Sequence, residues 1–194
     1  MFVRAWYNVN SRKALETIVW FANRQNPIDF YHVLKILFYA DKKHLNEHGR
    51  PILGDTYDAL PHGPVARTVY ALLKRDDALE AQFLEDDRNP YEDEAFTVSN
   101  RYWISPLRSP DLTCFSDSDI DALEWAFNEY GGKTFAELEE ETHKERAWRN
   151  ARERGDAIDY KDMLDGGDNE RTRKALQLAL GAPMAAIRKM PRAG

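Results

Sequence analysis

Apolar residues recur every three or four positions along much of the chain, as they do on the buried face of a helix. Ser11 suits the N-cap of a first helix, and a second helix is expected to open at Pro27 and Asp29 and to end at Gly49. Pro64 suits the first turn of a third helix. The apolar positions of the three patterns are Leu15, Ile18, Val19 and Ala22, then Phe30, Val33, Leu34, Leu37, Phe38 and Leu45, then Val65, Val69, Leu72 and Leu73.

The middle of the chain contains segments that are expected to be extended. One runs from Pro51 to about Leu60. A second shows strict alternation of apolar and polar residues on both sides of Ser99–Asn100, a pair that suits a turn, so it predicts a β-hairpin. The alternating apolar residues are Phe96, Val98, Tyr102 and Ile104.

The remainder of the chain again follows a helical pattern. Ser116 is expected to cap a helix that ends at Gly131, and Thr134 with Glu137 forms a capping box for the next. Glycines at 155, 166 and 167 set off a last helix of about residues 170–180. The fold class predicted from these patterns is mainly α (α+β), a helical domain with a small antiparallel sheet or hairpin.

Length and composition narrow the class of protein. The 194 residues suit one domain with a small appendage, and the single cysteine, Cys114, fits a reducing compartment. The first ten residues lack the pattern of a cleaved signal peptide, and no run approaches the ~18 apolar residues of a membrane span. We therefore expect a cytoplasmic protein with no membrane contact.

Charge is unevenly distributed along the chain. The net charge of −6 argues against a general nucleic-acid binder, which normally has a basic surplus. An acidic stretch covers Asp76–Glu94, and basic residues gather between Arg171 and Arg192. Either segment can be an ordinary solvated surface; the alternative is that the acidic stretch steers a basic partner.

The sequence HLNEH at residues 44–48 fits the H-x-x-E-H pattern of inverted zinc peptidases. On a helical wheel, Asp41, His44 and His48 fall inside the apolar face of the second helix, whereas Lys35, Lys42 and Asn46 point away from it. A buried carboxylate needs a partner. For Asp41 the candidates are His44 or backbone N–H groups of the segment after Gly49.

The zinc interpretation has little support in the rest of the sequence. A catalytic zinc needs a third protein ligand. His62 or His143 would have to be that ligand, and no second metal-binding motif in the sequence points to either. We therefore expect no metal, no cofactor and no catalytic residues. One alternative is a small metal-dependent hydrolase that uses Asp41, His44 and His48, with His143 as a further candidate residue. A second alternative is a DNA-binding regulator that acts through the basic tail.

Residues 33–74, VLKILFYADKKHLNEHGRPILGDTYDALPHGPVARTVYALLK, closely resemble the Panacea domain of the SocA-like antitoxin family. The resemblance continues in FSDSDIDALEWAFNEYG and in ELEEETHKERAWRNAR, and covers about residues 10–152. The chain departs from the family at His62, where an aromatic residue is common, and at Phe115, where leucine is usual. The matching positions are Lys35, Leu37, Tyr39, Asp41 and His44, then Gly54, Asp55, Tyr57 and Ala59, then Gly63, Pro64, Val65, Val69 and Tyr70, and last His143 and Trp148.

The resemblance implies an antitoxin, of a bacterial or mobile genetic element, that neutralises a co-encoded protein toxin by binding it. Some members are thought instead to be adaptors that deliver the toxin to a cellular protease, which is the alternative here. We expect a Panacea-like domain over residues 1–154 and a helical extension over 155–194 that packs on it or binds a partner. The resemblance also suggests partner-binding residues Tyr57, His62, Gly63, Pro64, Arg67 and Tyr70, and structural polar residues Asp41, His44, Asp55, His143 and Trp148.

The segment from Tyr57 to His62 allows two interpretations. An exposed strand edge there would recruit a partner by strand addition, with Tyr57 as an aromatic anchor. Alternatively, Tyr57 belongs to the core and Gly63–Pro64 forms only a turn. Direct binding of nucleic acid is not expected in either case.

Overall fold

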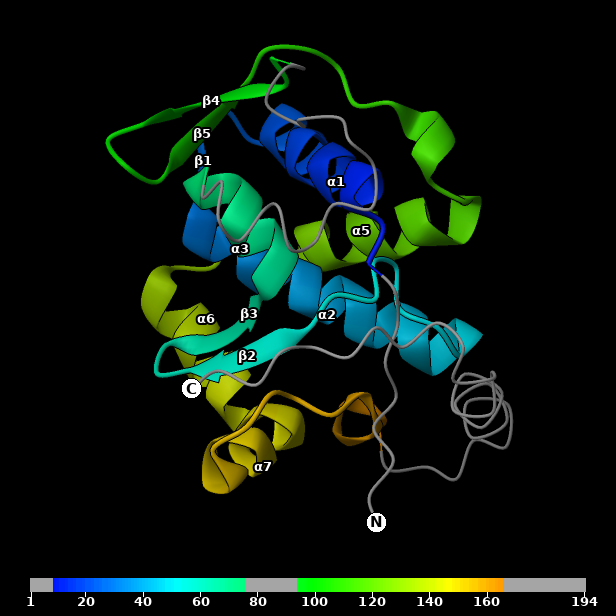
Figure 1. Cartoon of the computed structure of the whole chain (residues 1–194), viewed down its shortest axis with the longest axis vertical. Helices are drawn as coiled ribbons and strands as arrows, with labels where there is room; N and C mark the ends of the chain where they lie inside the picture. Colours follow the sequence, from blue (N-terminus) through cyan, green and yellow to red (C-terminus); the bar gives the residue numbers. More distant parts are fainter. Residues whose placement is uncertain (1–8, 76–93, 166–194) are drawn as a thin grey trace, which may run out of the picture.

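Helix α2, Phe30–His48, runs through the middle of the molecule, and most other elements pack around it (Figure 1). The computed structural model describes residues 9–75 and 94–165. Asp29 caps the start of α2 through His32 N, and Gly49 ends it in the left-handed conformation, with φ of 76°. The second predicted helix is therefore confirmed at both ends.

The other helices cover α2 from several sides. Helix α5 packs along α2, and α6 and α3 also contact it, whereas α1 packs against α3 and strand β5 (Figure 1). The helices are α1 Ser11–Arg24, α3 Arg67–Lys74, α5 Asp117–Tyr130, α6 Phe135–Lys144 and α7 Arg146–Arg154, with short 3-10 turns η1 Leu112–Cys114 and η2 Tyr160–Met163. The mainly helical fold class is confirmed.

Two small antiparallel sheets complete the fold. The predicted hairpin is present as β4 (Phe96–Ser99) and β5 (Trp103–Pro106), and β1 (Ile28–Asp29) adds a third strand in the order β1-β5-β4. The second sheet pairs β2 (Tyr57–Leu60) with β3 (Gly63–Ala66), with Leu60 opposite Gly63. This second sheet packs on α2 through β3; its strands carry Tyr57, Gly63 and Pro64, and its turn carries His62.

The third helix does not begin at Pro64, as the sequence predicted. Residues 63–66 form β3 instead, because Gly63, with φ of +104°, turns the chain back so that Pro64 pairs with Ala59. The start of α3 is fixed by the distant carboxylate of Asp55, which accepts hydrogen bonds from Thr68 N and Val69 N. A proline at a helix start was a reasonable local signal, but long-range pairing prevails.

The other helix boundaries follow the caps read from the sequence with two differences. Asn10, not Ser11, caps α1, through a hydrogen bond from Lys13 N. Ser116 and Thr134 cap α5 and α6 in capping boxes, as predicted. The segment after Thr134 is two helices, since the backbone is extended at Glu145.

Three predictions lie wholly or mostly outside the described residues: the acidic stretch Asp76–Glu94, the basic tail and the helix of residues 170–180. Residues 158–163 are described, and Ile158, Tyr160 and Met163 belong to the same buried core as the helices. Among the described helices, none combines the length and the apolar character that crossing a bilayer requires.

Candidate protein-binding site

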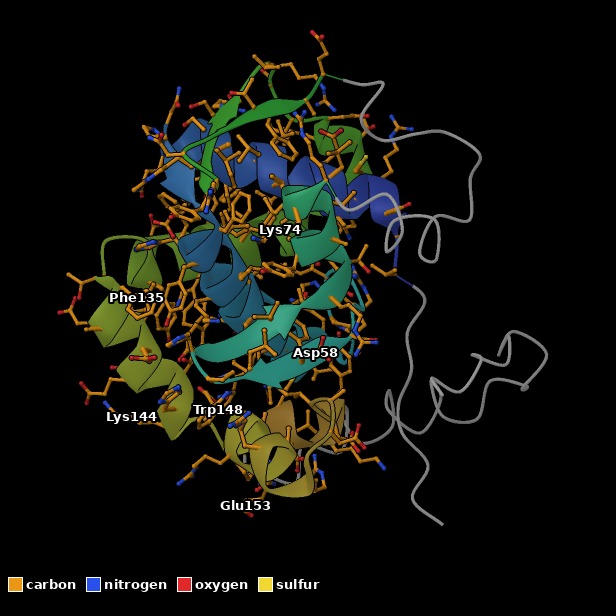
Figure 2. All side chains as sticks on the ribbon, turned by 60° about the vertical axis from the view of Figure 1, so that its left-hand side comes forward. Asp58, Lys74, Phe135, Lys144, Trp148 and Glu153 are labelled. Carbon is orange, nitrogen blue, oxygen red and sulfur yellow. The ribbon has the colours of Figure 1, made fainter. Side chains whose placement is uncertain are left out.

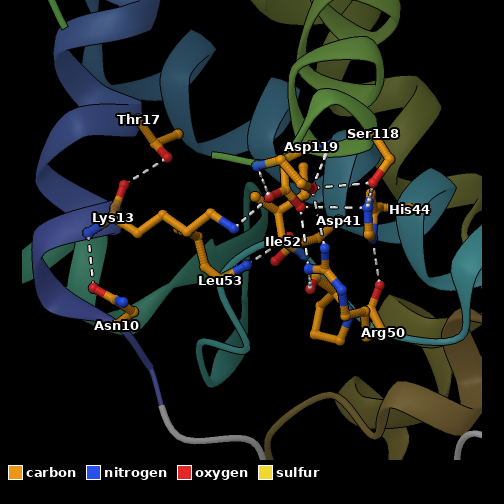
Figure 3. A network of polar contacts seen from close by, with 12 residues as sticks. Asn10, Lys13, Thr17, Asp41, His44, Arg50, Ile52, Leu53, Ser118 and Asp119 are labelled. Atoms are coloured by element: carbon orange, nitrogen blue, oxygen red, sulfur yellow. Dashed lines mark hydrogen bonds and ion pairs between the residues drawn. The ribbon is translucent and has the colours of Figure 1, made fainter. Parts of the chain in front are cut away.

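The side chain of Asp41 is fully buried and holds the loop that follows α2 (Figure 3). Its carboxylate accepts hydrogen bonds from Ile52 N at 2.8 Å, Leu53 N at 3.3 Å and the hydroxyl of Tyr57 at 2.9 Å. Burial raises the pKa of Asp41 to about 7, although these hydrogen bonds act in the opposite direction. Of the two partners considered for Asp41, the backbone N–H groups are the correct ones.

Asp55 is a second buried carboxylate in the same loop. Besides Thr68 N and Val69 N at the start of α3, it accepts from its neighbour Thr56 N at 2.7 Å. Burial raises the pKa of Asp55, and the backbone hydrogen bonds lower it. The carboxylate therefore acts as a helix cap supplied from a distant part of the chain.

His44 is also buried and belongs to a network that joins α2 to α5 (Figure 3). Its Nδ1 donates to Arg50 O at 2.7 Å, and its Nε2 lies 3.0 Å from Ser118 Oγ. Nearby, Asp119 accepts from Lys13 Nζ at 2.6 Å and from Arg50. Burial lowers the pKa of His44. Burial also acts to raise the pKa of Asp119, but hydrogen bonds from Lys13 and Ser116 lower it to about 2.

These contacts leave His44 unsuited to bind zinc. A histidine ligand needs a ring nitrogen with a free lone pair, and both nitrogens of His44 face groups of the protein. In the part of the chain that the structure describes, no three His, Cys, Asp or Glu side chains gather as a metal site. The geometry gives the H-x-x-E-H match a packing role.

Tyr57 lies in the core, so the first interpretation of β2 does not fit the structure. Its side chain is fully buried, and its ring packs edge-on against Phe38. The outer edge of β2 is also occupied: Ile158 N donates to Tyr57 O at 2.8 Å, and Arg152 donates to Ala59 O at 3.3 Å. A partner strand cannot add here without displacing these groups.

The turn between β2 and β3 is held by side chains from α6 and α7. His143 Nε2 donates to Pro61 O at 2.9 Å, and Trp148 Nε1 donates to Leu60 O at 2.9 Å. The two rings stack on each other with centroids 4.0 Å apart. With Arg152 on Ala59 O, three successive carbonyl groups each have a side-chain donor. The backbone of the turn is therefore fixed.

Beneath the turn, Gly63 and Pro64 are buried rather than exposed. Lys35 Nζ donates to Pro64 O at 2.7 Å. A Cβ atom on Gly63 would lie 2.5 Å from Thr142 Oγ1 and 3.0 Å from Lys35 Cε. Lys35 was expected to point away from the core, but β3 and α6 cover that side of α2, and the side chain is 1% exposed.

Above the turn, three side chains are open to solvent: Leu60 is 42% exposed, Phe135 is 46% exposed, and the side chain of His62 is 69% exposed. His62 Nδ1 lies 2.6 Å from Glu139 Oε1, and its ring contacts Phe135. Figure 2 shows Phe135 and Trp148 on the same side of the molecule. We call Leu60, His62 and Phe135 the turn face.

Only His62 of the turn face was singled out from the sequence. Leu60 and Phe135 were missed, although an apolar residue before Pro61 and another directly after the helix cap Thr134 were visible signals. Phe135 meets His62 only because α6 packs beside the turn, which no local pattern reveals.

Arg67 and Tyr70 lie further along, on the side of β2 and α3. Arg67 makes a bidentate ion pair with Asp58, with distances of 2.6 and 3.1 Å. Tyr70 is half-buried, and Lys74 Nζ lies 5.5 Å from its ring centroid. Figure 2 shows Asp58 and Lys74 on the ribbon of β2 and α3, away from Phe135.

Comparison with known proteins gives a match to one family model. A family model described as antitoxin SocA-like, Panacea domain, matches residues 33–149. The matched region includes α2, the β2–β3 turn, α6 and Trp148. Searches of curated proteins and of solved structures gave no match. Since the match covers more than half of the chain, the protein belongs to the SocA-like antitoxin family and contains its Panacea domain.

Proposed function

We propose that this protein neutralises a co-encoded protein toxin by direct binding, and that the turn face is the centre of the contact. The observation that carries the proposal is the combination of exposed and fixed groups at the turn. Leu60 and Phe135 expose apolar surface beside His62, while His143, Trp148 and Arg152 hold the backbone below. The family description supports the antitoxin role.

A fixed turn is well suited to bind another protein. Association loses less free energy to ordering when the contacting backbone is already held in one conformation. Apolar anchors at the centre of a contact contribute most of the binding free energy, and a polar margin mainly affects the rate of encounter. Arg67 and Tyr70 belong to the margin in this proposal, together with the acidic stretch, and neutralisation would follow from covering the toxin's active surface.

The test is co-expression with the product of the neighbouring gene, followed by affinity purification of the complex. Leu60→Asp places a charge in the turn face and should abolish co-purification and rescue of growth. The matched control is Leu112→Asp, because Leu112 is similarly exposed, at 56%, and lies just before α5, far from the β2–β3 turn. Both variants should melt close to the wild-type temperature.

Two results would count against the proposal. If wild-type protein rescues growth while no complex can be isolated, neutralisation is indirect, as it would be for a proteolytic adaptor. If folded Leu60→Asp and His62→Ala variants bind as tightly as wild type, the contact lies elsewhere on the molecule.

A further inference from the structure

Lys35 is an unusual residue to find in a protein interior. Its side chain is 1% exposed between α2, β3 and α6, and in the described part of the chain its amine makes one hydrogen bond, to Pro64 O. The ammonium group of a lysine has three N–H donors, and one hydrogen bond satisfies only one of them. Burial lowers the pKa of Lys35 to about 7, and nearby Glu139 offsets only part of that effect. The face of the Tyr31 ring, 4.7 Å away, provides weaker compensation.

The contact with Pro64 lies directly below the turn face. Gly63 is wedged between the end of the Lys35 side chain and Thr142, with no room for a Cβ atom. Its φ of +104° belongs to the region that side chains rarely adopt. Lys35 thus contacts two successive residues of the turn from the inside. Side chains of α6 and α7 hydrogen-bond to the carbonyl groups of the turn from the outside.

We propose that Lys35 is a positioning residue for partner binding: its amine holds the Pro64 carbonyl and so fixes the turn that presents Leu60 and His62. This inference rests on the proposed function, because it assigns Lys35 to the same binding site. Lys35 itself does not touch the partner. It acts through the conformation of residues 60–64.

Stability alone does not account for an amine at this place. A methionine has nearly the same length and volume, needs no hydrogen bonds and loses no hydration of a charge on burial. Replacing a buried charged group by an apolar residue is often neutral or stabilising. What methionine cannot do is donate to Pro64 O. The two roles therefore predict opposite results for one substitution.

The experiment compares Lys35→Met with Lys43→Met in complexes with the product of the neighbouring gene. Lys43 is a suitable control because it is a lysine of the same helix whose contacts are Glu47 and Trp125, not the turn. Lys35→Met should melt at or above the wild-type temperature, yet dissociate from the partner on the order of tenfold faster, the factor that one hydrogen bond represents. Lys43→Met should dissociate at the wild-type rate.

A second measurement needs no partner. In hydrogen exchange of the free protein, the amides of residues 62, 63, 65 and 66 should exchange faster in Lys35→Met, whereas those of α5 should not change. If the wild-type protein forms no complex, the proposed function fails, and this measurement still decides whether Lys35 holds the turn.

Several outcomes overturn the proposal. One is a folded Lys35→Met variant that dissociates at the wild-type rate. Another is that the backbone amides of the turn in Lys35→Met exchange at the same rate as in the wild-type protein. Lys35→Leu provides a second substitution; if neither variant folds, Lys35 is needed for the fold itself and the positioning role is wrong.

Discussion

Two buried polar regions contact α2, and they differ in how well their groups are paired. In the region below residues 49–56, each buried carboxylate accepts several hydrogen bonds, as Asp41 and Asp55 do from backbone N–H groups. In the region between α2 and α6, Lys35 makes one hydrogen bond, and the hydroxyls of Tyr31 and Tyr39 are buried without a partner among the described residues. The carboxylates of the first region are well paired, although the buried hydroxyl of Thr68 beside Asp55 also lacks a partner among the described residues, whereas the polar groups of the second region are mostly unpaired.

The difference indicates separate roles for the two regions. The well-paired carboxylates of Asp41 and Asp55 fix the loop after α2 and the start of α3, so they contribute to the frame of the protein. An incompletely paired region reduces stability, and such departures are expected where a site serves binding. The second region lies below the turn face, which is the place that the proposed function requires.

Removing the Asp41 carboxylate should have the largest effect on stability. Asp41→Ala leaves Ile52 N, Leu53 N and the Tyr57 hydroxyl without their acceptor in a fully buried place. We expect unfolding free energy to fall by about 3 kcal/mol, since each orphaned donor is costly. Urea denaturation measures the change.

Asp41→Asn is the matched control for that experiment. The amide keeps an acceptor oxygen and the shape of the side chain, so it should lose much less stability than the alanine variant. Equal urea midpoints for Asp41→Ala and wild type would mean that the loop after α2 does not depend on this residue.

The pH dependence of stability should carry a contribution from Asp41. Its pKa is raised to about 7, above the ordinary carboxyl value, so the folded protein holds a proton that the unfolded chain releases between about pH 4 and pH 7. Stability from this group is therefore present at low pH and is lost as pH rises through that window, by roughly 3 kcal/mol. Subtracting the Asp41→Asn profile isolates it. A difference that stays flat from pH 4 to pH 7 would contradict the raised pKa.

Much of the fold could be predicted from the sequence because the signals that specify it are local. The cap at Asp29, the glycine end at Gly49 and the capping boxes at Ser116 and Thr134 each act within a few residues. The error at Pro64 has a different origin. Asp55 fixes the start of α3 from thirteen residues away, and Gly63 pairs the next residues into β3, so tertiary contacts override the local preference.

The candidate site was harder to predict from the sequence, because it too depends on tertiary contacts. The wheel placed Asp41 and His44 inside, as the structure has them, but it also placed His48 inside, whereas His48 is exposed in the last turn of α2. It placed Lys35 outside because one helix alone does not show that β3 and α6 cover its other side. Tyr57 proved to be a core residue, and Phe135 meets His62 only through the packing of α6 beside the turn.

The contribution of Lys35 to stability should depend on pH in the opposite direction to the contribution of Asp41. Because its pKa is lowered to about 7, the unfolded chain binds a proton between about pH 7 and pH 10 that the folded protein does not hold. Wild-type stability should therefore rise with pH over this range. At pH 7 we expect Lys35→Met to be more stable than wild type by about 1 kcal/mol, and this advantage should disappear and then reverse towards pH 10 as the wild-type protein gains stability. Denaturation of both proteins at the two pH values measures it; a variant less stable than wild type at pH 7 would contradict the comparison.

The smallest effect is expected from the ion pair between Arg67 and Asp58. Both side chains are about one-third exposed, and pairs in such places contribute little because water and salt screen them. A double-mutant cycle with Arg67→Ala and Asp58→Ala should give a coupling of about 0.5 kcal/mol in the free protein. That small value makes the pair useful: if Arg67 lies at the margin of the partner contact, Arg67→Ala should slow association, most at low salt, without a matching loss of stability. A coupling above about 2 kcal/mol would show that the pair belongs to the frame, like the Asp41 network, and not to the partner-binding surface.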